Sequence, residues 1–220
     1  MIKSYDRHMA KKQPLQIEKT METDADQLIE VDDNNTVVGQ IGKIAAHQGK
    51  GVLHRAFTCF LFDENGWVLV TQRAAAKPLW PLYWDAACSS HQWFPQETAL
   101  EAARRRIPFE LGIQLDQSEP TREANQSELK DQPISLNLKE LFSYEYHAVY
   151  SKEASENEIN SIVVGTYDGE CQLNEHEVAQ YQWLSPTAVV KQLEETPATF
   201  APWFKLAWDG LIEHGWVKPS

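Results

Sequence analysis

The chain has 220 residues, of which 42% are hydrophobic, and its formal net charge is −12. This length suits one domain with a well-buried core. The excess of 32 acidic over 20 basic residues argues against a nucleic-acid binder, which needs a basic face to displace phosphate counterions. It does not exclude a small anionic substrate, because a few placed cations and a metal ion can set the local field.

The cysteines and the hydrophobic segments together predict a cytoplasmic protein. Cys59, Cys88 and Cys171 are odd in number and lack the spacing of a disulfide framework, which indicates free thiols in a reducing compartment. The first 20 residues have no apolar stretch of the kind that a signal peptide needs. No apolar run reaches the length of about 18 residues that spans a bilayer, so we expect no contact with membranes.

The N-terminal part of the chain divides into a polar tail and a series of hairpins. Residues 1–27 are charged and lack periodicity, so we expect a tail there and a domain over residues 28–220. Four segments with strand composition are bounded by turn residues. These predicted strands are residues 28–31, 37–41, 56–62 and 67–71. Asn65 and Gly66 lie between the last two and form a strong turn signal, because both tolerate positive φ.

The remainder of the chain alternates between helices and strands. Residues 97–111 are rich in helix formers and are followed by Gly112, which predicts a helix with a C-terminal cap. Residues 114–135 are polar and predict an excursion loop. Three further strands and two helices are predicted at residues 138–150, 160–167, 179–184, 187–193 and 200–214. This order indicates an α+β fold with a mixed, mostly antiparallel sheet.

Five residues are candidate ligands for a divalent metal ion: His47, His54, His91, Glu156 and Glu158. The two glutamates stand two residues apart at the entry to a strand, so both carboxylates face one side and repel each other unless a cation lies between them. Imidazole and carboxylate ligands together suit Mn²⁺ or Zn²⁺ better than Ca²⁺. The alternatives are surface or core histidines and a solvent-exposed acidic strand end.

Five basic residues flank predicted loops or strand ends and are candidates for binding a diphosphate. They are Lys43, Arg73, Lys77, Arg105 and Arg106. Ordinary salt bridges are the alternative, in particular between Arg105 and Glu101, which are four residues apart. Glu110 follows Arg106 at the same spacing, where its carboxylate either pairs with the arginine or holds Mg²⁺ against the phosphates.

Aromatic residues gather in two places, on the last predicted helix and in the loop before His91. They are Phe200, Trp203, Trp208, Trp80 and Trp84. Aromatic residues at helical spacing usually pack in a core. The alternative is that one indole lies over the substrate and shields a cationic intermediate with its π face.

Five short motifs stand in the order that a known family shows. They are Ala-Ala-His47 with Leu-His54, Trp80-Pro81 with Trp84-Asp-Ala-Ala-Cys-Ser-Ser-His91, Arg105-Arg106 with Glu110-Leu-Gly-Ile113, Glu156-Asn-Glu158, and Phe200-Ala-Pro-Trp203. From about residue 28 to residue 210, the chain resembles the type I isopentenyl-diphosphate isomerases of the Nudix superfamily. The resemblance implies a Nudix-like α/β/α fold. It also implies conversion of isopentenyl diphosphate to dimethylallyl diphosphate by addition and removal of protons.

The resemblance also implies roles for individual residues. His47, His54, His91, Glu156 and Glu158 fall on the metal ligands of the family, and Glu110 falls on the ligand of a second ion, Mg²⁺. Lys43, Arg73, Lys77 and Arg106 fall on the cations that bind the diphosphate. Tyr146 and Glu158 fall on the residues of proton transfer, and Trp203 falls on the indole that stabilises the carbocation.

The chain departs from the family at Ser89, which occupies the position of the catalytic cysteine. A thiol with a pKa of about 8.5 exchanges protons near neutrality, whereas an aliphatic hydroxyl is a far weaker acid. Three outcomes are open. The protein is a slow isomerase that uses Ser89, an isomerase that uses the neighbouring Cys88 after a backbone shift, or a relative that has lost the reaction.

Two other functions are alternatives to isomerisation. A Nudix-type hydrolase of prenyl or nucleoside diphosphates needs several glutamates on its helix, and Arg106 and Phe109 replace two of them. Glu156 and Glu158 would then have to take their place. A non-catalytic prenyl-diphosphate binding protein would keep the cations and tolerate Ser89. In each case the expected partner is a small prenyl diphosphate, and we expect a monomer or a homodimer.

Overall fold

The computed structural model describes residues 26–115 and 136–218. The predicted tail at residues 1–27 and the excursion at residues 114–135 lie outside this part, apart from two residues of each. In the described part of the chain, no helix is both long enough and apolar enough to span a bilayer.

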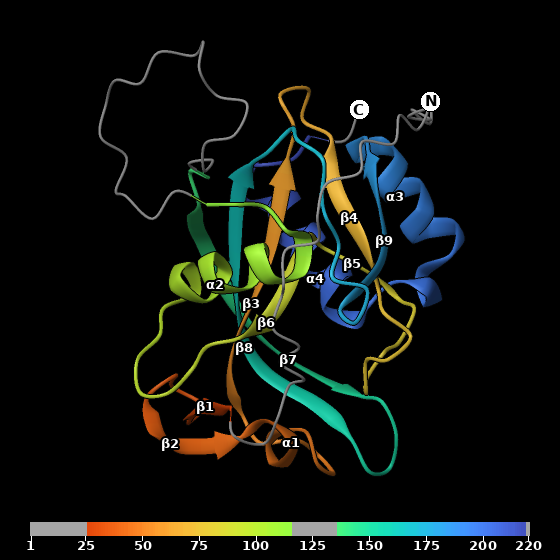
Figure 1. Cartoon of the computed structure of the whole chain (residues 1–220). Helices are drawn as coiled ribbons and strands as arrows, with labels where there is room; N and C mark the ends of the chain where they lie inside the picture. The colour runs from red at the N-terminus through yellow and green to blue at the C-terminus, as the bar shows by residue number, and fades with distance from the viewer. Residues whose placement is uncertain (1–25, 116–135, 219–220) are drawn as a thin grey trace.

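A mixed sheet of nine strands forms the centre of the domain, and helices cover both of its faces (Figure 1). The strands are β1 Gln27–Val31, β2 Val37–Gly42, β3 His54–Phe62, β4 Val68–Arg73, β5 Trp84–Asp85, β6 Cys88–His91, β7 Lys139–Val149, β8 Ser155–Thr166 and β9 Val178–Leu184. Strand β3 is central and pairs with β1, β4, β6 and β8. The β3–β8 pair is parallel and every other described pair is antiparallel, which confirms the predicted sheet type.

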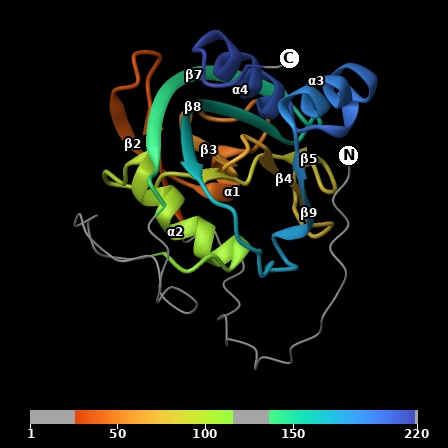
Figure 2. The ribbon, with the colours of Figure 1, turned by 90° about the horizontal axis from the view of Figure 1, so that it is seen from above.

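The helices divide between the two faces of the sheet. They are α1 Lys43–Ala46, α2 Ala99–Leu111, α3 Pro186–Glu195 and α4 Pro202–Glu213, with a 3₁₀ turn at Pro197–Thr199. Helix α2 lies on one side of the sheet, and α3 and α4 lie on the other (Figure 2). This three-layer arrangement is the predicted α/β/α architecture.

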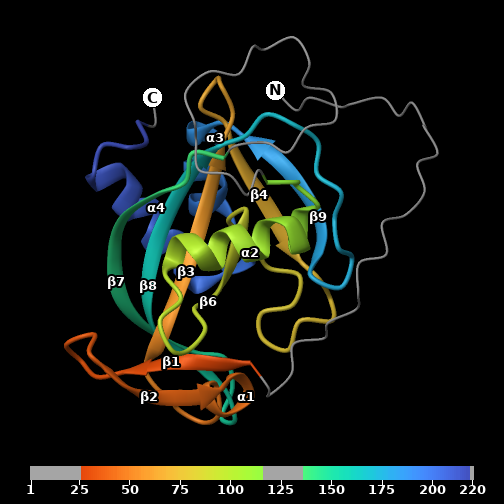
Figure 3. The same cartoon turned by 60° about the vertical axis from the view of Figure 1, so that its left-hand side comes forward.

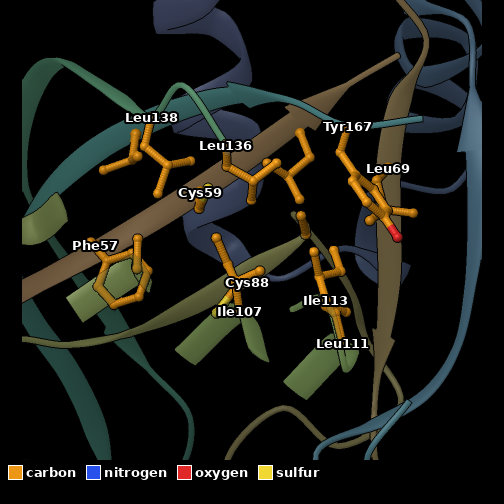
Figure 4. Packing of buried hydrophobic residues seen from close by; sticks show 14 of the residues in the cluster. Phe57, Cys59, Leu69, Cys88, Ile107, Leu111, Ile113, Leu136, Leu138 and Tyr167 are labelled. Atoms are coloured by element: carbon orange, nitrogen blue, oxygen red, sulfur yellow. The ribbon is translucent and has the colours of Figure 1, made fainter. Parts of the chain in front are cut away.

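Strand β3 feeds both hydrophobic cores, because successive side chains of a strand point to opposite faces. Phe57 packs with Ile107 of α2 in one core (Figure 4). Phe60 packs with Phe204 and Trp208 of α4 in the other. All five side chains are at most 1% exposed. The expectation that Trp208 serves the core is therefore confirmed.

Helix α2 begins and ends at strong capping signals. The Thr98 hydroxyl accepts a hydrogen bond from the Glu101 amide, and the Glu101 carboxylate accepts one from the Thr98 amide, which completes a capping box. Gly112 ends the helix with a φ of 66°, in the left-handed region that favours glycine. Because Glu101 caps its own helix, it does not form the predicted salt bridge with Arg105. Arg105 instead pairs with Glu97 and stacks on the Trp93 ring.

The predicted hairpins and helices are present, and the differences are the start of β8, two short strands and the short helix α1. Strand β8 begins at Ser155, five residues before the predicted start at residue 160, so Glu156 and Glu158 lie within a paired strand. Strands β5 and β6 were not expected, because they have only two and four residues. Their pairing with β4 and β3 places residues 84–91 within the sheet instead of in a loop.

Candidate metal centre and active site

The five predicted metal ligands meet at one end of the sheet, where β1, β2 and α1 also gather (Figure 3). His54 is the first residue of β3 and lies opposite Glu158 of β8. His91 ends β6 opposite Ala56, and His47 follows the short helix α1. One potential ligand atom from each of the five residues lies within 4.8 Å of all the others. The centroids of the three imidazole rings are 5.0 Å apart in every pair.

Backbone carbonyls orient two of the imidazole rings towards this cluster. The Nδ1 atom of His47 lies 2.6 Å from the Lys43 carbonyl oxygen, and that of His54 lies 2.7 Å from the Val52 carbonyl oxygen. A carbonyl only accepts, so each Nδ1 carries a proton, and in the neutral imidazole each Nε2 has the lone pair that a metal ion binds. This arrangement of outer hydrogen bonds is typical of metal-binding histidines.

The cluster has the burial and charge that a divalent cation requires. His54 is 0% exposed and each glutamate 5%. Among the described residues, His54 Nε2 and His91 Nδ1 have no hydrogen-bond partner, and two carboxylates are buried side by side. Buried groups of this kind cost free energy unless a partner satisfies them. The residues present therefore fit a divalent metal ion, and they form the one such group in the described part of the chain.

Burial and charge adjust two histidines of the cluster in opposite directions. Burial lowers the pKa of His91 well below its usual value, and the nearby Lys43 charge adds to this effect. Burial also acts against the His47 imidazolium, but the Glu156 carboxylate, 2.8 Å from His47 Nε2, outweighs it and raises that pKa. A neutral imidazole is the form that binds a metal, and His91 is held in this form.

Tyr146 and Glu158 form a proton-bearing pair at the edge of the cluster. The residues lie opposite each other on β7 and β8, and the tyrosine hydroxyl donates to Glu158 Oε2 at 2.6 Å. Burial and the Glu158 charge raise the pKa of Tyr146 well above its usual value. Burial opposes ionisation of Glu158, but the nearby His54 imidazole, 3.5 Å away, and the hydrogen bond from Tyr146 lower its pKa. The pair therefore combines a protonated phenol with an ionised carboxylate.

Ser89 and Cys88 point to opposite sides of β6. Ser89 lies opposite Thr58 of β3, on the same face as His91, and its hydroxyl is 2.9 Å from Asp85 Oδ1. Cys88 is 1% exposed and packs beside Ile107 in the core under α2 (Figure 4). Burial and the nearby Glu110 carboxylate raise the pKa of the Cys88 thiol well above its usual value. The thiol of Cys88 therefore lies in the core, and its catalytic role, which needs a backbone shift, stays a prediction.

The predicted phosphate-binding cations lie in three places. Lys77 and Arg106 both form ion pairs with Glu177, and Arg106 also pairs with Glu110 at 2.7 Å. Arg73 pairs with Asp85 at 3.3 Å. Lys43 lies on the side of the histidines, where its charge acts on His91. Arg105 is the exception among the five: it pairs with Glu97 and donates to the His91 carbonyl oxygen at 3.1 Å.

Comparison with known proteins agrees with this geometry. The NUDIX domain family matches residues 52–204. Isopentenyl-diphosphate Delta-isomerase 2 of Aromatoleum aromaticum is 31% identical over 187 residues, with 85% of this chain and 87% of the relative covered. Isopentenyl-diphosphate Delta-isomerase of Paenarthrobacter aurescens is 33% identical, with 83% and 89% covered. The chain belongs to the isopentenyl-diphosphate isomerase family of the Nudix superfamily.

Solved structures support the fold of this family member. The crystal structure of DR0079 from Deinococcus radiodurans matches with a TM-score of 0.61 at 20% identity, over 82% of this chain and 96% of that one. The MutT protein of Methanosarcina mazei Go1 matches with a TM-score of 0.53 at 14% identity, over 74% and 95%. At these identities the matches establish the Nudix fold and nothing about the substrate.

Aromatic rings border the polar site of this isomerase-family chain. The Trp203 indole donates to Asp85 Oδ1 at 2.9 Å, and its ring centroid is 6.2 Å from that of Tyr146. Trp80 meets Trp203 edge to face at 5.4 Å, and the Arg73 guanidinium lies 5.1 Å from the Trp203 ring centre. Trp203 is thus buried like a core residue and also borders the site. Its role as a shield over the substrate stays a prediction.

Sequence reasoning missed two carboxylates of the site, Asp85 and Glu177. Asp85 is 3% exposed and Glu177 is 6% exposed, and each pairs with predicted phosphate-binding cations. Asp85 carried a signal, because it is a lone acid in the mainly apolar stretch before Ser89. Glu177 lies in a polar segment near other acidic residues, and nothing in the sequence distinguishes it from a solvent-exposed glutamate.

Proposed function

We propose that this protein interconverts isopentenyl diphosphate and dimethylallyl diphosphate, by protonation and deprotonation on two sides of the bound substrate. The observation that carries the proposal is the Tyr146 hydroxyl, which donates to a Glu158 carboxylate that also lies against His54 and His91. One residue thus connects a proton donor to a metal-binding cluster. The family membership of the chain gives this arrangement its reaction.

Residues at the mouth of the site would bind the diphosphate. Lys43, Arg73, Lys77 and Arg106 carry the charges that compensate it, and Mg²⁺ held by Glu110 would share its oxygens. In the structure Arg106 and Lys77 neutralise Glu110 and Glu177. Binding of a diphosphate would therefore exchange carboxylate partners for phosphate oxygens on these cations, and Glu110 would be released to bind the Mg²⁺ ion.

The His₃Glu₂ cluster would hold Mn²⁺ or Zn²⁺. When bound, such an ion supplies the positive charge that keeps two buried carboxylates ionised, and it fixes the position of Glu158. Tyr146 and Glu158 then hold and deliver a proton at one side of the substrate. Ser89 lines the other side, and Trp203 presents its indole between them.

The aromatic residues would protect the cationic intermediate. Trp80, Trp203 and Tyr146 belong to one buried cluster beside the polar pair. Their rings exclude water, which would quench a carbocation, and an indole face stabilises positive charge. These features serve isomerisation, whereas hydrolysis requires an ordered water molecule. Glu97, which precedes α2, pairs with Arg105, and Glu101 of its first turn forms the helix cap, so neither is poised to activate water.

Proton NMR of isopentenyl diphosphate with the protein, Mg²⁺ and Mn²⁺ tests the proposal, with the Ser89→Cys variant in parallel. We expect wild type to form dimethylallyl diphosphate and to incorporate solvent deuterium. Turnover by Ser89→Cys alone would mean that the natural protein binds prenyl diphosphates without converting them. Release of inorganic phosphate by both proteins, without the isomer, would establish a hydrolase instead.

A further inference from the structure

The carboxylate of Asp85 lies directly behind the Ser89 hydroxyl. Ser89 Oγ donates to Asp85 Oδ1 at 2.9 Å, whereas the other acceptor near it, Thr58 Oγ1, is 3.4 Å away. Asp85 is 3% exposed, and Ser89 is half-buried on the polar face of the sheet. A substrate on this face of the sheet would therefore reach Ser89 and not Asp85.

Three other groups hold the Asp85 carboxylate in place. The Trp203 indole donates to Oδ1 at 2.9 Å, and the Ala86 amide donates to the same oxygen at 2.7 Å. The Arg73 guanidinium lies 3.3 Å from Oδ2. None of these partners belongs to the His₃Glu₂ cluster. Asp85 is therefore a fixed buried anion, independent of the metal centre, whose hydrogen-bonded neighbour Ser89 lies on the same face of β6 as His91.

A serine hydroxyl alone is a poor carrier of protons near neutrality, because it is both a very weak acid and a weak base. An adjacent carboxylate changes this, since it accepts the hydroxyl proton while the oxygen accepts another. The arrangement of a reactive hydroxyl, a proton acceptor and groups that orient the acceptor is a recurrent solution for activating serine. Asp85, with Trp203 and Arg73 behind it, completes such an arrangement.

We propose that Asp85 accepts the substrate proton through Ser89, and that this relay replaces a thiol on that side of the substrate. The inference rests on the proposed isomerase function. A C–H bond next to the cationic carbon breaks, and its electron pair forms the new C=C bond. The proton bonds to Ser89 Oγ as the hydroxyl proton moves to Asp85 Oδ1. A C–H bond beside a carbocation is a strong acid, so a weakly basic carboxylate suffices. Proton exchange with solvent then removes the proton from Asp85 and returns one to the Tyr146 side.

A purely structural role for Asp85 predicts a different pattern of variants. If Asp85 only fixes Trp203 and Arg73, its loss harms the enzyme whatever residue stands at position 89. If it takes the proton from Ser89, its loss harms the serine enzyme far more than a Ser89→Cys enzyme. A thiol has a pKa of about 8.5 and exchanges protons without a partner.

The test measures kcat and KM for Asp85→Asn in the wild-type and the Ser89→Cys backgrounds. We expect Asp85→Asn to lower kcat by about 100-fold or more in the serine enzyme, and by less than about tenfold in the cysteine enzyme, with similar KM effects in both. Thr58→Val removes the more distant hydroxyl near Ser89 as a matched control, and we expect a loss of about fivefold or less. Thermal unfolding establishes that each variant is folded.

Deuterium exchange gives a second readout that a structural defect would not reproduce. In D₂O, Asp85→Asn should still exchange protons of the terminal CH₂ of isopentenyl diphosphate through the Tyr146 side, while product formation falls about 100-fold. Equal kcat losses in the two backgrounds, or a parallel fall of exchange and product, would overturn the relay and leave the isomerase function intact. A wild type without turnover beside an active Ser89→Cys variant would overturn both.

Discussion

Two neighbouring residues of β6 belong to different parts of the molecule. Ser89 faces the polar side of the sheet with the histidines and glutamates, and Cys88 faces α2 and the larger core. The polar side contains buried charges and histidine nitrogens without partners, which are unfavourable for folding until a ligand satisfies them. The α2 side contains close-packed apolar groups and complete helix caps. The comparison teaches that the two faces of β6 differ: the Ser89 face carries a candidate metal ligand, His91, and the Cys88 face packs into the core under α2.

This division explains why a thiol next to the catalytic position cannot replace the missing one. A strand alternates its side chains, so a shift by one residue moves every side chain of that strand to the other face. Bringing Cys88 to the site would therefore bury Ser89 and turn His91 away from the cluster. Such a rearrangement would cost free energy, because it removes a metal ligand as well as core packing.

The largest expected effect is on the polar side, at Glu158. Glu158→Gln removes the charge that pairs with Tyr146 and with two histidines, while it preserves the shape of the side chain. We expect kcat to fall by about 10³-fold or more, in the range of a lost acid–base group. Glu145→Gln is the matched control, since Glu145 is exposed next to Tyr146 on the same strand. It should change kcat by no more than about twofold. Comparable losses in the two variants would contradict the role of Glu158.

Metal binding should stabilise the fold through the same cluster. A metal at 100 times its dissociation constant raises the free energy of unfolding by about 2.7 kcal/mol if it binds only the folded state. We expect Zn²⁺ or Mn²⁺ to produce a gain of this order in wild type, and a much smaller gain in His54→Gln. His176→Gln, at an exposed histidine of the loop before β9, should keep the full gain. Urea unfolding with and without metal measures the difference, and an unchanged gain in His54→Gln would place the metal elsewhere.

The next prediction concerns stability on the α2 side, at Gly112. Its φ is 66°, and a Cβ there would lie 2.5 Å from the Gln172 carbonyl oxygen. We expect Gly112→Ala to lower the free energy of unfolding by about 2 kcal/mol. Gly66→Ala isolates the backbone contribution, because its φ is 75° and no atom lies within 4 Å. It should cost about 1 kcal/mol. Equal losses in urea unfolding would show that the close contact with Gln172 has no effect.

The two faces also show how much of the structure could be predicted from the sequence. Turn and cap signals act locally, so Asn65-Gly66 and Gly112 were enough to locate a hairpin and the end of α2. The five candidate metal ligands were identified because the paired glutamates favour a cation between them and because five motifs stand in the order of a known family, whereas spacing alone left surface or core histidines as an alternative. Strands β5 and β6 were missed because two to four residues show no period, and only pairing with β3 and β4 makes them strands. The partner of Ser89 depends on this pairing, so Asp85 became visible only in three dimensions.

The smallest expected effect is at Cys88, and it tests the difference between the two faces of β6 most directly. Cys88→Ala removes one buried sulfur atom from the core beside Ile107 and should cost about 1 kcal/mol of stability. It should change kcat by no more than about twofold, since the thiol faces away from the polar side. Ser89→Ala should show the reverse pattern, with little loss of stability and a large loss of kcat. Urea unfolding and proton NMR turnover of the two variants provide both values. An inactive but stable Cys88→Ala protein would mean that the two faces of β6 exchange during catalysis. The distinction between the Ser89 face and the Cys88 face would then be wrong.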